Sequence, residues 1–126
     1  MNPARPAPGA LLAHLDDIPD PGAIVRDFRN GYFYFSLLLA RRGGAAFAFE
    51  NRCPHAGSPL ERPDGRVVVQ EGRFMVCTAH AASFMLDGGA CAGGPCDGKG
   101  LTPPAIEILD GAILLRAPDS DRAGGA

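Results

Sequence analysis

Residues 53–80 read CPHAGSPLERPDGRVVVQEGRFMVCTAH, and this stretch contains four of the seven cysteines and histidines of the chain. It begins with a Cys-x-His pair, Cys53 and His55, and ends with a Cys-x-x-His pair, Cys77 and His80. The whole chain of 126 residues has only four cysteines and three histidines. Two thiolates and two imidazoles at this spacing can hold either a tetrahedral zinc ion or an iron–sulfur cluster.

The residues around the two pairs favour the cluster. The first pair continues as Ala56-Gly57-Ser58-Pro59-Leu60, and the second is followed by Phe84 and later by Gly93-Gly94-Pro95. From residue 47 to residue 115 the chain resembles the Rieske family of 2Fe–2S proteins, which have two cluster loops and a third loop, bearing a proline, that covers them. The resemblance implies one 2Fe–2S cluster, with Cys53 and Cys77 on one iron and His55 and His80 on the other.

Structural zinc is the main alternative for these four residues. In Cys₂His₂ zinc sites the two histidines usually follow one another at a short spacing, whereas here each histidine is paired with a cysteine. A departure from the small ferredoxins of the family is the stretch of 21 residues between His55 and Cys77. We expect the surplus to form a longer hairpin around residues 63–65.

Composition and charge exclude several classes of protein. The net charge is −2 and there is no block of basic residues, so nothing indicates nucleic-acid binding. The longest apolar run, residues 32–40, is interrupted by Ser36 and is too short to span a membrane. Residues 1–10 have no apolar core of a secretory signal, which predicts a cytoplasmic protein. A reducing compartment also suits thiolate ligands.

Many short strands separated by turn dipeptides predict an all-β fold. We expect flexible residues 1–9, one domain over residues 10–117, and a loose tail over residues 118–126. A base barrel or sandwich would consist of residues 10–50 and 99–117, with a cluster-binding subdomain, about residues 51–98, inserted in it. Asn30-Gly31 and Asp110-Gly111 predict tight hairpins. The strands are expected at residues 11–15, 23–28, 32–41, 45–50, 67–70, 74–76, 105–109 and 112–116.

Other conspicuous residues have ordinary interpretations. Tyr32-Phe33-Tyr34-Phe35 is expected in the core, and His14 on an exposed edge. Asp16, Asp17 and Asp20 form either an acidic docking patch or a solvated loop. Cys91 and Cys96 flank the third loop. They are interpreted as two small buried apolar residues, with a disulfide or a redox-active pair as the alternative.

The resemblance implies a ferredoxin that carries one electron at a time and is not itself an enzyme. High-potential respiratory members have a serine and a tyrosine two and four residues after the second histidine, and an extra cysteine pair between the loops. Here the matching positions are Ala82, Phe84, Ser58 and Ala79. This departure predicts a potential at the low end of the family range.

The partners implied are a flavin-dependent reductase and a terminal oxygenase or other redox enzyme. An oxygenase subunit would need a second iron domain, for which 126 residues leave no room. We expect docking at the tip that carries His55 and His80, ringed by Ala56, Leu60, Ala81 and Pro95. Three alternatives remain: a fixed small subunit of a larger oxidoreductase such as a nitrite reductase, a zinc-binding interaction module, and a redox sensor that uses Cys91 and Cys96.

Overall fold

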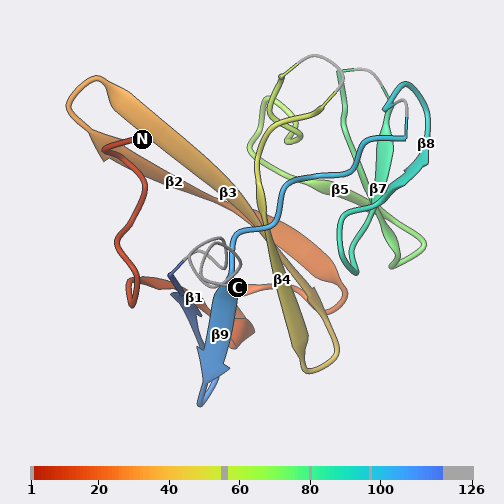
Figure 1. The fold of residues 1–126 in the computed structure, drawn as a ribbon. Coiled ribbons are helices and arrows are strands. Elements are labelled where there is room, and N and C mark those ends of the chain that lie inside the picture. The colour runs from red at the N-terminus through yellow and green to blue at the C-terminus, as the bar shows by residue number, and fades with distance from the viewer. Residues whose placement is uncertain (1, 55–56, 80, 97, 118–126) are drawn as a thin grey trace, which may run out of the picture.

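The computed structural model describes residues 2–54, 57–79, 81–96 and 98–117, and these form an all-β fold (Figure 1). It has ten strands and one short 3₁₀ turn, η1, in the described ranges. In chain order these are β1 Leu11–His14, η1 Leu15–Asp17, β2 Gly22–Asn30, β3 Phe33–Arg42, β4 Ala45–Glu50, β5 Val68–Gln70, β6 Phe74–Val76, β7 Ser83–Met85, β8 Cys91–Gly93, β9 Ile106–Leu109 and β10 Ala112–Leu115.

The strands form three antiparallel sheets. The first and last parts of the chain make two three-stranded sheets, β1-β10-β9 and β2-β3-β4, which together are the base. The third sheet, β5-β6-β7-β8, lies between β4 and β9 in the sequence and on one side of the base in space (Figure 1). The fold is therefore the predicted one, a base sandwich with an inserted subdomain.

Strand β3 separates two buried cores. Leu37 and Leu39 point into the base core, whereas Leu38 and Ala40 point into the site core, and all four are completely buried. The alternation follows from the period of two in a strand, which sends successive side chains to opposite faces. The base core comprises Ala4, Leu12, Ala13, Ile18, Phe35, Leu37, Leu39, Ala48, Ile113 and Leu115. The site core comprises Leu38, Ala40, Phe49, Cys53, Leu60, Met75, Cys77, Ala82, Phe84, Leu86, Cys96 and Leu101.

The two predicted hairpins are present. Asp110 and Gly111 both have positive φ, 49° and 81°, and close the turn between β9 and β10. In the first hairpin the register differs by one residue from the expectation. Asn30 pairs with Phe33, so Gly31 and Tyr32 form the turn, and of these two only Gly31 has a positive φ. This is the pattern of a type II′ turn, which needs glycine at its first central position.

The prediction that residues 32–35 lie in the core is wrong for three of them. Tyr32 is fully exposed, Phe33 and Tyr34 are about half exposed at 53% and 43%, and only Phe35 is buried. The reason is length: β4 pairs with residues 37–42 of β3, so the tip of the β2–β3 hairpin extends beyond β4 (Figure 1).

Residues 2–9 were expected to be flexible, but in the structure they lie against the base. Ala4 is buried in the base core, and the Gly9 N–H donates to the Leu115 carbonyl. Asn2 Nδ2 donates to the Tyr34 carbonyl at 2.8 Å, and Asn30 Nδ2 donates to the Pro3 carbonyl at 3.1 Å. The expected tail, residues 118–126, lies outside the described residues.

The acidic connection after β1 is tied to the base. Asp17 lies 3.7 Å from the Arg26 guanidinium, Asp16 lies at the same distance from Arg41, and Asp20 accepts the Gly43 N–H at 2.7 Å. His14 is exposed on edge strand β1, as expected. Within the described ranges, the structure contains no apolar helix of the length needed to span a bilayer.

Candidate metal centre

Cys53 and Cys77 begin two loops with the same backbone hydrogen bonds. Each cysteine N–H donates to the carbonyl five residues later, Ser58 or Ala82, at 2.8 Å. Each cysteine carbonyl accepts the N–H four residues later, from Gly57 or Ala81, at 2.7 Å. We call residues 53–58 the first loop and residues 77–82 the second loop. Two loops of this kind can present one sulfur each to a shared site.

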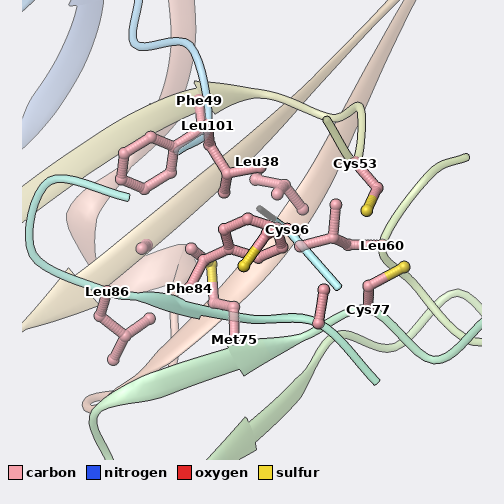
Figure 2. Packing of buried hydrophobic residues seen from close by; sticks show 12 residues of the cluster. Leu38, Phe49, Cys53, Leu60, Met75, Cys77, Phe84, Leu86, Cys96 and Leu101 are labelled. Atoms are coloured by element: carbon pink, nitrogen blue, oxygen red, sulfur yellow. The ribbon is translucent and has the colours of Figure 1, made fainter. Parts of the chain in front are cut away.

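Both cysteines are completely buried at one side of the site core. Figure 2 shows Cys53 and Cys77 on the same side of this core, with Leu60 between them and Phe84 farther inside. Buried sulfur in an apolar setting is shielded from solvent, which suits a metal site that must resist hydrolysis and oxidation. His55, Ala56 and His80 lie outside the described residues, so the structure places two of the four predicted ligands.

The third loop packs directly on the second loop. A side chain built at Gly94 would place its Cβ 2.6 Å from the Ala81 carbonyl oxygen and 2.9 Å from the Ala82 Cα. Only glycine allows this approach, and Gly94 also has a positive φ of 78°. The prediction that residues 93–95 cover the cluster loops is thus supported at its contact with residues 81 and 82.

A disulfide joins Cys91 and Cys96 across the third loop. The preferred interpretation, two buried apolar residues without a bond between them, was therefore wrong, and the alternative of a disulfide holds. Cys91 opens β8, which pairs with β7 through Phe84, and Cys96 is buried in the site core. The sequence could not decide this point, because two cysteines five residues apart fit either interpretation.

The long segment between the two loops turns where it was expected to turn. The Arg62 N–H donates to the Arg66 carbonyl and the Gly65 N–H donates to the Arg62 carbonyl, both at 2.8 Å. This turn forms one side of an open groove beside the two loops. The groove is lined by Ser58, Pro59, Glu61, Arg62, Pro63, Gly65, Val68, Thr78 and Ala79.

A buried polar residue at the start of the first loop was missed by the sequence reasoning. Asn51 is 8% exposed, and its side-chain amide contacts Ser36, Leu60 and Glu61. The signal available in the sequence was an asparagine between the end of a strand and a Cys-Pro-His loop. Ser36 in turn donates to Asp27, which also accepts the Tyr34 hydroxyl proton. Burial raises the pKa of Tyr34, and its bond to Asp27 acts in the same direction.

The predicted ring of docking residues needs one correction. Leu60 is completely buried, because its side chain fills the site core between the two cysteines. Ala81 and Pro95 are exposed, as expected. Ala56 lies outside the described residues.

The described residues fit a 2Fe–2S cluster. Two sulfur donors from equivalent loops are buried in the same core, and a third loop packs against the second of these loops. Thiolate is the ligand type that such clusters use. The two histidines of the same motif stand two and three residues after these cysteines in the sequence.

Solved structures share this fold. A ferredoxin of carbazole 1,9a-dioxygenase from Nocardioides aromaticivorans IC177 is 20% identical with a TM-score of 0.66, and the alignment covers 87% of this chain and 98% of that one. A ferredoxin from Sphingomonas yanoikuyae B1 is 23% identical with a TM-score of 0.65, and the alignment covers 87% and 99%. The quaternary ammonium Rieske monooxygenase CntA is 20% identical with a TM-score of 0.67, and the alignment covers 94% of this chain and 35% of that one.

No curated protein matches the chain significantly. A family model, described as the Rieske 2Fe-2S domain, matches residues 12–110. This match covers both loops, the segment between them and strands β2 to β9, and it ends before β10. The chain therefore belongs to the family of Rieske 2Fe–2S domains, which bind one 2Fe–2S cluster.

Proposed function

We propose that the chain is a ferredoxin that carries one electron at a time on a 2Fe–2S cluster held by Cys53, His55, Cys77 and His80. The observation that carries the proposal is the pair of equivalent loops with buried cysteines. Each loop has a histidine at a matching place in the sequence. The cluster supplies reversible one-electron chemistry, at potentials of roughly −150 to +300 mV for centres with two histidine ligands.

The choice of ligands sets how costly the added electron is. Cys53 and Cys77 each contribute one negative charge as thiolates, whereas His55 and His80 contribute none when neutral. A site with four thiolates would therefore be two charges more negative at the moment of reduction. With fewer negative charges nearby, the added electron is less strongly repelled, so this ligand set raises the potential above that of an all-cysteine site.

Ala82, at the end of the second loop, and Phe84, in β7, keep the proposed potential at the low end of that range. Ala82 and Phe84 are completely buried and present no hydroxyl group to the site. Hydrogen bonds to cluster sulfur stabilise the reduced, more negative state and raise the potential. Without those two hydroxyl groups, we expect a potential below that of members that have them.

The proposed partners are a flavin-dependent reductase as electron donor and a terminal oxygenase or another redox enzyme as acceptor. A solved complex of reduced oxygenase and oxidised ferredoxin from carbazole 1,9a-dioxygenase contains a chain of similar fold, with a TM-score of 0.65 and 20% identity. The exposed residues Ala81 and Pro95 and the open groove beside the first loop offer a small docking area. A small interface suits a carrier that must dissociate after each transfer.

We assign the protein to the cytoplasm, where reducing conditions keep Cys53 and Cys77 as thiols. The Cys91–Cys96 disulfide must then resist reduction there, and burial of Cys96 shields one of its two sulfur atoms. A second candidate is an electron-transfer subunit that stays bound in a larger oxidoreductase. The alignment with CntA covers 35% of that chain, so a domain of this fold can also stand within a larger oxidoreductase. Gel filtration separates the two, since a carrier elutes as a small protein and a subunit elutes with its partner.

A redox titration monitored by visible absorption tests the proposed function. We expect reversible bleaching that fits a one-electron process near the low end of the Rieske range, roughly −150 mV. A titration that shows no reversible one-electron process in protein with bound iron would overturn the proposal.

A further inference from the structure

Asn51 makes four hydrogen bonds, two to Ser36 in the base and two to the residues that follow the first loop. Its backbone N–H donates to the Ser36 carbonyl at 2.9 Å, and its side-chain Nδ2 donates to Ser36 Oγ at 3.0 Å. The same Nδ2 donates to Glu61 Oε1 at 2.7 Å, and Oδ1 accepts the Leu60 N–H at 2.9 Å. Both amide hydrogens and the amide oxygen of this buried side chain are therefore used.

These bonds join the chain on both sides of the first loop. Asn51 stands two residues before Cys53, whereas Leu60 and Glu61 stand just after Ser58, where the loop closes. The side chain of Asn51 thus holds the entry and the exit of the loop together. Ser36, in the centre of β3, holds both to the base.

The second loop is held in a different way. Its entry strand β6 and its exit strand β7 pair directly, with Val76 opposite Ser83. The first loop enters from β4, but the residues after it form no strand until β5 begins at Val68. The two loops have the same internal hydrogen bonds, so the first must obtain its outer support from another source. At the first loop, the side-chain amide of Asn51 therefore takes over the support that the β6–β7 strand pairing gives to the second loop.

We propose that Asn51 is a positioning residue that sets the geometry of the first loop, and with it the placement of Cys53 as a ligand. The inference rests on the proposed ligand set. Removing the amide leaves the loop closed by its own hydrogen bonds but loosens it from Leu60, Glu61 and the base. A buried amide that satisfies three partners is costly to remove, because the partners lose their hydrogen bonds together.

The rate of iron release to a chelator measures this role, and the loss of visible absorption monitors the release. In Asn51→Ala we expect release to be about 10- to 100-fold faster, which is the size of the loss in metal affinity that removal of an outer-shell group causes. The electron paramagnetic resonance spectrum of the reduced protein should also change, because it depends on ligand geometry. Asn30→Ala is the matched control, since Asn30 ends β2 at the tip of the β2–β3 hairpin, away from the third sheet (Figure 1), and bonds the exposed Pro3 carbonyl. It should leave both readouts unchanged.

A donor–acceptor exchange separates positioning from general destabilisation. Asn51→Asp alone sets two carboxylates against each other at the contact with Glu61, and should release iron faster than the unsubstituted protein. Adding Glu61→Gln supplies an amide that can donate to the new carboxylate, so the double variant should recover part of the slow release. Should Asn51→Ala not accumulate as folded protein, these two variants carry the test.

Unchanged release and an unchanged spectrum in Asn51→Ala would overturn the inference. A double variant no better than Asn51→Asp would also overturn it, because a specific amide contact would then not matter. The proposed function fails separately, if the unsubstituted protein binds zinc and no cluster. In that case zinc release from the same variants would still report on Asn51.

Discussion

Gly57 and Ala81 hold the same position in the two cysteine loops. Each lies four residues after its cysteine, donates its N–H to the cysteine carbonyl at 2.7 Å, and has a positive φ, 76° for Gly57 and 61° for Ala81. Glycine adopts this backbone conformation without strain, whereas an alanine there is strained by its Cβ. The second loop therefore carries a local strain that the first loop lacks.

Ala81→Gly should stabilise the protein and Gly57→Ala should destabilise it, each by about 1 kcal/mol in the free energy of unfolding. Among the described residues, a Cβ at Gly57 would meet only Arg52, at 3.5 Å or more, so we expect backbone strain to dominate the effect there. Chemical denaturation of the metal-loaded proteins measures both changes. Equal effects of the same sign would show that the two loops do not share this conformation.

Gly94→Ala should displace the third loop from the second. The new Cβ would lie within 3 Å of both the Ala81 carbonyl oxygen and the Ala82 Cα, and neither backbone atom can move without disturbing the second loop. We expect most of the purified variant to lack iron. Gly93→Ala is the control, since its Cβ would have no atom of the described part of the chain within 4 Å. Equal iron content in the two variants would show that the contact does not support the site.

Replacing both Cys91 and Cys96 by alanine should lower the free energy of unfolding by about 2 kcal/mol. This is the contribution expected when a disulfide closes a loop of this short length and so restricts the unfolded chain. A dithiol reductant should have the same effect on the unsubstituted protein and none on the double variant, because the bond is then already absent. Denaturation in the presence and absence of reductant measures both. A reductant effect of equal size in the double variant would place its origin elsewhere.

Local sequence signals predicted the base well. The tight turns at Asp110-Gly111 and after Asn30 contain residues that favour positive φ. Strand β3 was predicted to be covered on both faces, because apolar residues fill every position from 37 to 40. Strands β7 and β8 were missed. Each is three residues long and contains serine or glycine, so neither has a pattern that could be distinguished from a loop.

The features that the sequence could not provide are those set by distant segments. Tyr32 and Phe33 have the composition of a core strand, but their exposure depends on where the opposing sheet ends. Leu60 follows a ligand loop in the sequence yet fills the core beneath it. The contacts of Asn51 join residues 36, 60 and 61, and no local pattern records which of these it meets.

Phe84→Tyr should raise the reduction potential. Residue 84 belongs to the same buried core as Cys53 and Cys77, and a hydroxyl there would stabilise the more negative, reduced state. Allowing about 1 kcal/mol for the difference between the two states, and about 59 mV for a tenfold change in a one-electron equilibrium, the shift is about +40 mV. Voltammetry of the fully loaded variant measures it. An unchanged or lower potential would mean that residue 84 does not face the metal site.

Iron, zinc and acid-labile sulfide analysis of the purified protein tests the central claim most directly. We expect a red-brown protein with about two irons and two sulfides per chain. His80→Ala, which removes one proposed ligand, should lose most of both. One zinc per chain, with no sulfide and no visible absorption, would contradict the account.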